Sequence, residues 1–256
     1  MSAVPRPRRR PLRGALGSAL GVAWALATIA ALAPSAHAAD DWSLERRASD
    51  PALVGQRFAK LRQNPFDQAQ WRALRKALGP EALSRRIESA LERAADDVAL
   101  NVLSARAALD GGDPARAAQT LARIEPKAGR WRGQVFAMRV DALVEAGENR
   151  AALSALLAEA DASTEPARTK VLERAHALAD RAGFDEDALR LAHRLAERDD
   201  SFDSHLRLAR AAARATDGPA ADRAFARAIE KAPARRRDEL VIERARARLD
   251  NDDATG

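Results

Sequence analysis

Four turn-forming segments recur along this chain at nearly equal intervals. They are Gly112-Asp113-Pro114, Gly147-Glu148-Asn149, Gly183-Phe184-Asp185 and Thr216-Asp217-Gly218. The first residues of successive segments are 35, 36 and 33 residues apart. Glycine ends helices readily because it enters the left-handed region without a side-chain penalty, and the acid that follows can cap the next helix. The spacing therefore predicts a series of helix pairs with a period of about 34 residues.

Small residues occupy matching places in these predicted helix pairs. In the last pair, Ala209 and Ala212 lie in the first helix, and Ala221, Phe225 and Ala228 lie in the second. The places of Ala221 and Phe225 are taken in the earlier pairs by Ala117 and Leu121, Ala152 and Leu156, and Ala188 and Ala192. Small side chains let two helices approach closely, and alanine is the best helix former. We therefore expect these alanines to be buried between helices.

The stretch from Phe202 to Pro233 resembles the tetratricopeptide repeat in its small residues, its turn and its closing proline. The resemblance covers residues 98–233 well, as four repeats, and residues 64–97 loosely, as an atypical first repeat. It implies an all-α superhelix, or solenoid, of about five stacked helical hairpins with capping helices. One hairpin buries too little apolar surface alone, so stacked hairpins must share a core. Protein binding is the class of activity that the resemblance implies.

Three helices are predicted before the regular array. Asp50 and Pro51 suit the start of the first, Asp67 suits the cap of the second, and Pro80 suits the first turn of the third. Their apolar residues recur at helical spacing: Leu53, Val54, Phe58 and Leu61, then Trp71, Leu74 and Leu78, then Leu83, Ile87 and Leu91. Residues 39–63 are thus expected to form an N-terminal segment with a capping helix.

Residues 234–256 are expected to cap the other end of the array. Leu240, Ile242, Ala245 and Leu249 recur amid alternating charge, which predicts a polar, solvated helix over about 237–249. The tail from Asp250 onward is expected to fray.

The first 38 residues have the composition of a bacterial secretory signal. Five arginines precede an apolar run from Gly14 to Leu32, and the segment ends in Ala36-His37-Ala38. We expect cleavage after Ala38, with an uncleaved inner-membrane anchor as the alternative. Both interpretations place the repeats in the periplasm.

The net charge of +6 comes mostly from this segment. Removing its five arginines from the 43 basic residues leaves 38, against 37 acidic residues. The remaining charge is close to balanced, so the composition gives no support for nucleic-acid binding. Contact with a membrane is expected only if the signal segment stays uncleaved.

No motif in the chain indicates catalysis. There is no cysteine, no phosphate-binding glycine loop and no nucleophile elbow. The histidines beyond the signal segment, His176, His193 and His205, lack the spacing of metal ligands on one helix turn. We expect a non-enzyme without a cofactor or a metal.

The remaining candidate is the concave groove that the first helix of each hairpin lines in proteins of the tetratricopeptide type. Carried over by register, that pattern points to a set of polar residues of mixed charge, which we call the groove set. Its members are Arg106, Asp110, Gln134, Asp141, Glu145, Lys170, Glu173, Asp180, Arg181, Asp203, Arg210 and Arg214.

The sequence therefore predicts a scaffold or adaptor of the bacterial cell envelope that binds a peptide or protein in this groove. The alternative is an accessory subunit of an envelope assembly, secretion or cell-wall enzyme complex. A third interpretation, a lipid-surface or nucleic-acid binder, would rest on Arg235, Arg236 and Arg237. Steep weakening of binding with salt would distinguish the third interpretation from the other two.

Overall fold

The computed structural model describes residues 50–255, which lie within one compact unit spanning Leu44–Gly256. The predicted signal segment, residues 1–38, lies outside the described residues. Within the described part, twelve α-helices follow one another. They are α2 (Pro51–Gln63), α3 (Gln68–Leu78), α4 (Pro80–Leu91), α5 (Val98–Asp110), α6 (Pro114–Ile124), α7 (Arg132–Glu145), α8 (Asn149–Ala162), α9 (Ala167–Arg181), α10 (Asp185–Ala196), α11 (Phe202–Arg214), α12 (Gly218–Lys231) and α13 (Ala234–Thr255). Two short 3-10 turns, Glu125–Lys127 and Gly129–Trp131, connect α6 to α7.

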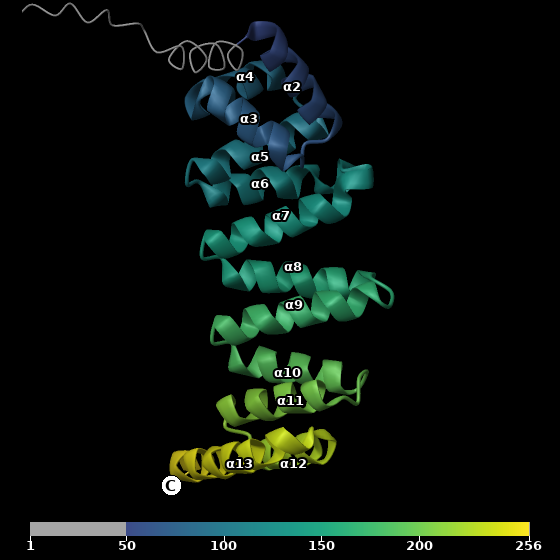
Figure 1. Ribbon diagram of the computed structural model, residues 1–256, viewed down its shortest axis with the longest axis vertical. Helices are drawn as coiled ribbons and strands as arrows, with labels where there is room; N and C mark the ends of the chain where they lie inside the picture. Colours follow the sequence, from purple (N-terminus) through teal and green to yellow (C-terminus); the bar gives the residue numbers. More distant parts are fainter. Residues whose placement is uncertain (1–49, 256) are drawn as a thin grey trace, which may run out of the picture. The chain divides into compact units, whose positions relative to one another are not determined.

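Each helix of this unit packs mainly against the helices before and after it in the sequence. Figure 1 shows the helices from α5 to α13 succeeding one another in chain order. This packing of adjacent pairs confirms the predicted fold class, an all-α protein of stacked helical hairpins.

The predicted turns separate the helices of the regular hairpins. Gly112, Gly147 and Gly183 have φ angles of 77°, 77° and 69°, so all three occupy the left-handed region, as predicted. In the fourth turn this place falls to Thr216, at φ 56°. A β-branched residue is uncommon in this region, so the last turn keeps the conformation of the others without the glycine that would favour it.

The predicted helix caps are confirmed at some starts and wrong at others. The carboxylate of Asp50 accepts a hydrogen bond from the Ala52 amide at 2.9 Å, and that of Asp67 accepts one from Gln70 at 3.0 Å. Likewise, Asp113 caps α6, accepting from the Arg116 amide at 3.0 Å.

The acids that follow the second and third glycines do not cap their helices. Glu148 stands at the N-cap of α8 without a side-chain hydrogen bond to the helix. Asp185 lies one residue inside α10, where Phe184 takes the N-cap. Its negative charge still suits the first turn, since that end of a helix is partly positive.

The alanines that define the repeat are buried. Ala117, Ala152, Ala188 and Ala209 are inaccessible to solvent, and Ala221 is 2% exposed. Methyl groups at these places let paired helices approach closely. This confirms the prediction from their spacing.

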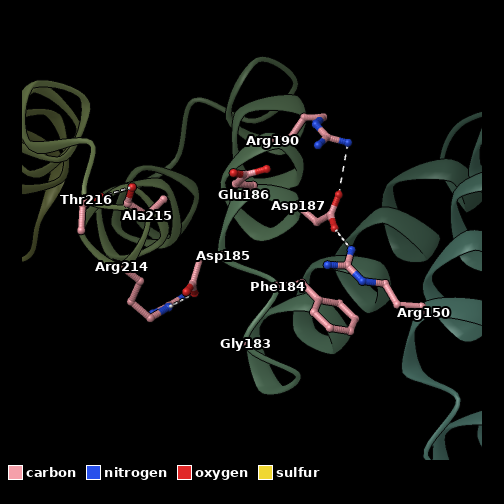
Figure 2. Close-up of a pocket in the computed structure, with 10 residues that line it drawn as sticks. All are labelled: Arg150, Gly183, Phe184, Asp185, Glu186, Asp187, Arg190, Arg214, Ala215 and Thr216. Atoms are coloured by element: carbon pink, nitrogen blue, oxygen red, sulfur yellow. Dashed lines mark hydrogen bonds and ion pairs between the residues drawn. The ribbon is translucent and has the colours of Figure 1, made fainter.

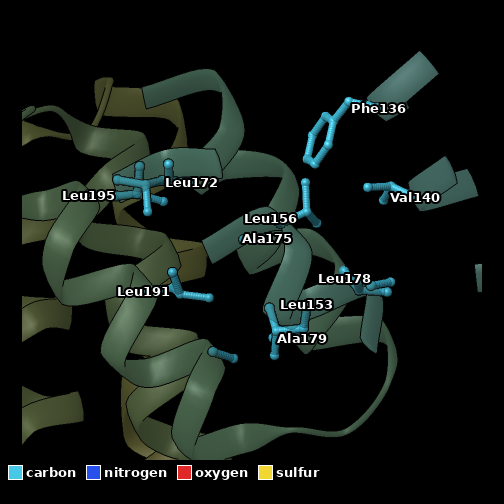
Figure 3. Close-up of a cluster of buried hydrophobic side chains, with 13 residues drawn as sticks. Phe136, Val140, Leu153, Leu156, Leu172, Ala175, Leu178, Ala179, Leu191 and Leu195 are labelled. Carbon is cyan, nitrogen blue, oxygen red and sulfur yellow. The ribbon is translucent and has the colours of Figure 1, made fainter. Parts of the chain in front are cut away.

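The apolar core passes from one hairpin to the next. One cluster joins Val140 of α7, Leu156 of α8, Leu172 of α9 and Leu191 of α10 (Figure 3). These four helices belong to two successive hairpins, so each hairpin completes the core of its neighbour. Stability is therefore shared along the array.

The C-terminal helix differs from its prediction in two respects. It continues to Thr255, so the expected frayed tail is helical. Its outer face is also less polar than predicted for a capping helix, because Ile242 and Leu249 are 54% and 66% exposed. Only Leu240 of the predicted apolar set is fully buried.

Among the helices of residues 50–255, none combines the length and the apolar character that a membrane-spanning segment requires.

Candidate functional site

A cleft of about 370 Å³ lies between α9 and α11 and brings together four members of the groove set. These are Asp180 from α9 and Asp203, Arg210 and Arg214 from α11. We call it the α9–α11 cleft; His176, Leu206 and Arg207 complete its lining.

The regular spacing of α11 explains why its charges gather there. Asp203, Arg207, Arg210 and Arg214 are separated by four, three and four residues, which places them on one face of a helix. The opposite face carries Ala209 and Ala212, which are fully buried. Packing of the small residues therefore directs the charged face outward.

Two of the three cleft arginines are held by acids. Nε of Arg210 donates to Glu243 of α13 at 2.7 Å, and its Nη2 donates to the second carboxylate oxygen at 3.0 Å. Arg214 donates to Asp180 of α9 and lies 3.6 Å from Asp185. These pairs fix the two guanidinium groups at the edges of the cleft.

The third arginine, Arg207, has no such restraint. It is half-buried, and within residues 50–255 it makes no hydrogen bond or ion pair. The lining of the cleft holds three arginines and two aspartates, and Glu243 and Asp185 beside it contribute two further negative charges. Hydrogen bonds from Ser201 and Ser204, and the nearby charge of Arg207, lower the pKa of Asp199, so Arg207 has an acid near it but forms no ion pair with it.

His176 lies beside this arginine and is 7% exposed. Its Nε2 atom is buried and has no hydrogen-bond partner among the described residues. Burial, together with the positive charges of Arg207 and Arg214, lowers the pKa of His176 to about 4. The ring is therefore neutral at pH 7.

Ion pairs also connect successive first helices along the array. Arg174 of α9 donates to Asp141 of α7 at 2.7 Å, and Arg75 of α3 lies 3.1 Å from Asp110 of α5. With the Arg214–Asp180 and Arg210–Glu243 pairs, these contacts join residues 33 to 35 positions apart. They bridge hairpins at the period of the repeat, so Asp110 and Asp141 already have structural partners.

Arg106 takes a structural position. It is 4% exposed and donates to the Pro65 carbonyl at 2.6 Å and to Oε1 of Gln68 at 2.8 Å. Its guanidinium also lies 4.6 Å from the centre of the Trp71 ring. Burial lowers the pKa of Arg106 to about 10, which still leaves it charged at neutral pH. These contacts tie α5 to α3 and to the turn between α2 and α3, and they leave little of Arg106 for a partner.

The other members of the groove set lie on α7 and α9 outside this cleft, and all are exposed. Arg181 folds back to donate to the Ala177 carbonyl at 3.1 Å. The remaining four are Gln134, Glu145, Lys170 and Glu173.

A larger cleft of about 630 Å³ lies along the turns before α10 and α12. Figure 2 shows its charges turned toward one another: Asp187 lies between Arg150 and Arg190. The guanidinium of Arg150 also lies 3.6 Å from the centre of the Phe184 ring. Because these groups satisfy each other, the larger cleft is a weaker candidate than the α9–α11 cleft.

The groove set did not include Arg207 and His176. Arg207 lies four residues after Asp203 and three before Arg210, so the helical spacing could have identified it. His176 could not be found in this way, because its burial and the unpaired Nε2 atom depend on how α11 packs over α9.

A scan against protein-family models gave no match, and a search of curated proteins found no significantly similar sequence.

Proposed function

We propose that this protein is a non-catalytic adaptor of the tetratricopeptide type, and that the α9–α11 cleft binds a segment of a protein partner that carries a carboxylate. The spacing of the turns, the buried alanines and the core shared between hairpins support the repeat type. The signal-like N-terminal sequence supports a place in the periplasm, with an inner-membrane anchor as the alternative.

The observation that carries the binding proposal is the pair formed by Arg207 and His176. A guanidinium can bind a carboxylate through two parallel hydrogen bonds, and within residues 50–255 Arg207 forms no hydrogen bond or ion pair that would occupy it. Asp180 and Glu243 are engaged by the neighbouring arginines Arg214 and Arg210, so neither acid forms an ion pair with Arg207.

Binding of a partner carboxylate in the cleft should also change the protonation of the His176 ring. A carboxylate beside Arg207 offsets the positive charges that hold the pKa of His176 low, and so favours the protonated ring. Binding is therefore expected to raise the pKa of this histidine. NMR titration of the His176 ring, with and without a peptide rich in glutamate, measures this change.

A capture experiment tests the proposal in the cell. The wild-type chain, an Arg207→Glu variant and an Arg72→Glu variant are each expressed and purified from envelope extract. Arg72 is an exposed arginine of α3, so its substitution matches the change of charge away from the cleft. We expect one stoichiometric partner with the wild type and the α3 variant, and its loss with Arg207→Glu.

Two results would count against the proposal. Equal capture by all three chains would place the binding surface elsewhere. Co-purification of an active enzyme that survives Arg207→Glu would favour the accessory-subunit alternative.

A further inference from the structure

The exposed large apolar side chains of residues 50–255 all belong to α13. Val241, Ile242 and Leu249 are 53%, 54% and 66% exposed. Exposed apolar residues that gather on one element indicate a contact surface more strongly than scattered ones do.

These side chains form a stripe along one face of the helix. Ile242, Ala245 and Leu249 are separated by three and four residues, and all three are exposed, with Val241 at their flank. The opposite face of α13 carries Leu240, which is fully buried, and Ala247, which packs against the same core. The helix therefore has one apolar face toward α11 and α12 and a second face without a covering helix among the described residues.

We propose that this second face packs against the same face of a second copy of the chain, with the two α13 helices antiparallel. The spacing of three and four residues is that of a two-helix seam, in which side chains of one helix fit between those of the other. Ile242 of each copy then lies against Ala245 of the other. An alanine opposite each isoleucine lets the helices approach closely.

The charges beside the stripe favour this arrangement. Glu239 and Arg246 lie on one flank, seven residues apart, and Arg235 and Asp250 lie nearer the two ends of the helix. Glu239 also pairs with Arg236 of its own helix at 3.4 Å, an exposed pair that a second copy can replace or share. In an antiparallel pair, Glu239 of one copy meets Arg246 of the other, and Arg235 meets Asp250.

In an antiparallel pair, contacts that share one register are centred on the same point of the helix. The two charge pairs and the Ile242–Ala245 pair meet this condition, because all three are centred between Ile242 and Arg244, within one residue of each other. One register thus joins the central Ile242–Ala245 contact with the flanking charge pairs, and it places Leu249 of each copy opposite Asp238 of the other at the ends of the seam.

A second copy fits this surface because the arrangement is self-complementary. A two-fold axis repeats every contact, so one Glu239–Arg246 attraction becomes two. A parallel pair would instead place Glu239 beside Glu239 and Arg246 beside Arg246. The antiparallel dimer is therefore the pairing that the charges select.

Sedimentation equilibrium of the full chain, kept in mild detergent over a range of concentrations, tests the proposal. The measured mass should rise toward twice that of one chain. Ile242→Ser with Leu249→Ser should return the single-chain mass with the helical circular dichroism unchanged, because both side chains are exposed.

Charge reversal identifies the register. Glu239→Arg or Arg246→Glu alone should weaken the dimer by about tenfold, since each substitution places like charges together at two symmetric positions. The double variant restores opposite charges and should regain the wild-type dissociation constant to within about threefold. Arg72→Glu on α3 serves as the matched control and should leave the dimer unchanged.

Three outcomes would overturn the proposal. They are a single-chain mass at every concentration, a dimer that survives the two serine substitutions, and a double charge reversal weaker than either single one.

Discussion

The neutral state of His176 makes the stability of the protein depend on pH. The folded ring has a pKa of about 4, whereas an unfolded histidine titrates near 6.5. Because the unfolded chain binds this proton more readily, acid favours unfolding. The stabilising effect is complete above about pH 6.5 and is lost progressively as the pH falls toward 4.

The size of this effect follows from the shift in pKa. A change from 6.5 to about 4 corresponds to about 3 kcal/mol at 1.4 kcal/mol per unit. The ring lies at an open cleft, and residual contact with water reduces the expected loss to about 2 kcal/mol.

Urea denaturation at several pH values measures this loss. The free energy of unfolding is compared between the wild type and His176→Gln, whose side chain does not titrate. Between pH 6.5 and 4 the wild type should lose about 2 kcal/mol more than the variant. The acids of the array, such as Asp97 and Glu159, also have lowered pKa values and lose stabilising contacts in acid, but they do so equally in both chains. Parallel curves for the two chains would refute the inference that His176 is buried and neutral beside Arg207.

Three further predictions concern the stability of the array. Replacing Ala221 with Leu should overpack the last hairpin and lower the free energy of unfolding by about 1–3 kcal/mol in chemical denaturation. Arg210→Ala removes only a surface ion pair and should lower it by less than about 1 kcal/mol, so the opposite ranking would show that the repeat register is wrong. Arg106→Ala should cost about 2–4 kcal/mol, because it leaves the Pro65 carbonyl without its buried donor, and a loss below 1 kcal/mol in the same assay would contradict that role. Gly147→Ala should lower stability by about 1 kcal/mol through its positive φ alone, since the space around a new Cβ is empty; an unchanged thermal midpoint would contradict this.

The helices and their order could be predicted from the sequence because the signals are local. Asp50, Asp67 and Asp113 cap the helices that follow them, and the glycines adopt the left-handed conformation that their turns require. Buried alanines at matching places in each pair gave the register, since only small residues fit where two helices touch.

The predictions that were wrong concern features that depend on tertiary contacts. Glu148 has the right place to cap α8 but makes no such hydrogen bond. The extra length of α13 was missed because Asn251 packs closely at Gly218 of α12, with its Cβ 3.4 Å from where a Cβ on that glycine would lie. That contact joins residues 33 positions apart and leaves no local signal in the sequence.

The candidate site was predictable only in part. The helical face of α11 follows from spacing, and four residues of the groove set do meet in one cleft. Spacing could not show that Arg106 turns inward to the Pro65 carbonyl, or that Asp141 and Asp110 are taken by arginines of neighbouring hairpins. These contacts depend on which polar and charged groups the stacking of the hairpins brings together.

Site-specific photocrosslinking in cells tests the binding role of the α9–α11 cleft most directly. A photoreactive residue at Asp203, at the rim of the cleft, is compared with one at Arg72 of α3, which is also exposed. We predict a single protein adduct at the cleft position, absent from the α3 position and lost when Arg207→Glu is added. The same adducts at both positions, or an adduct that persists with Arg207→Glu, would contradict the proposal that this cleft binds the partner.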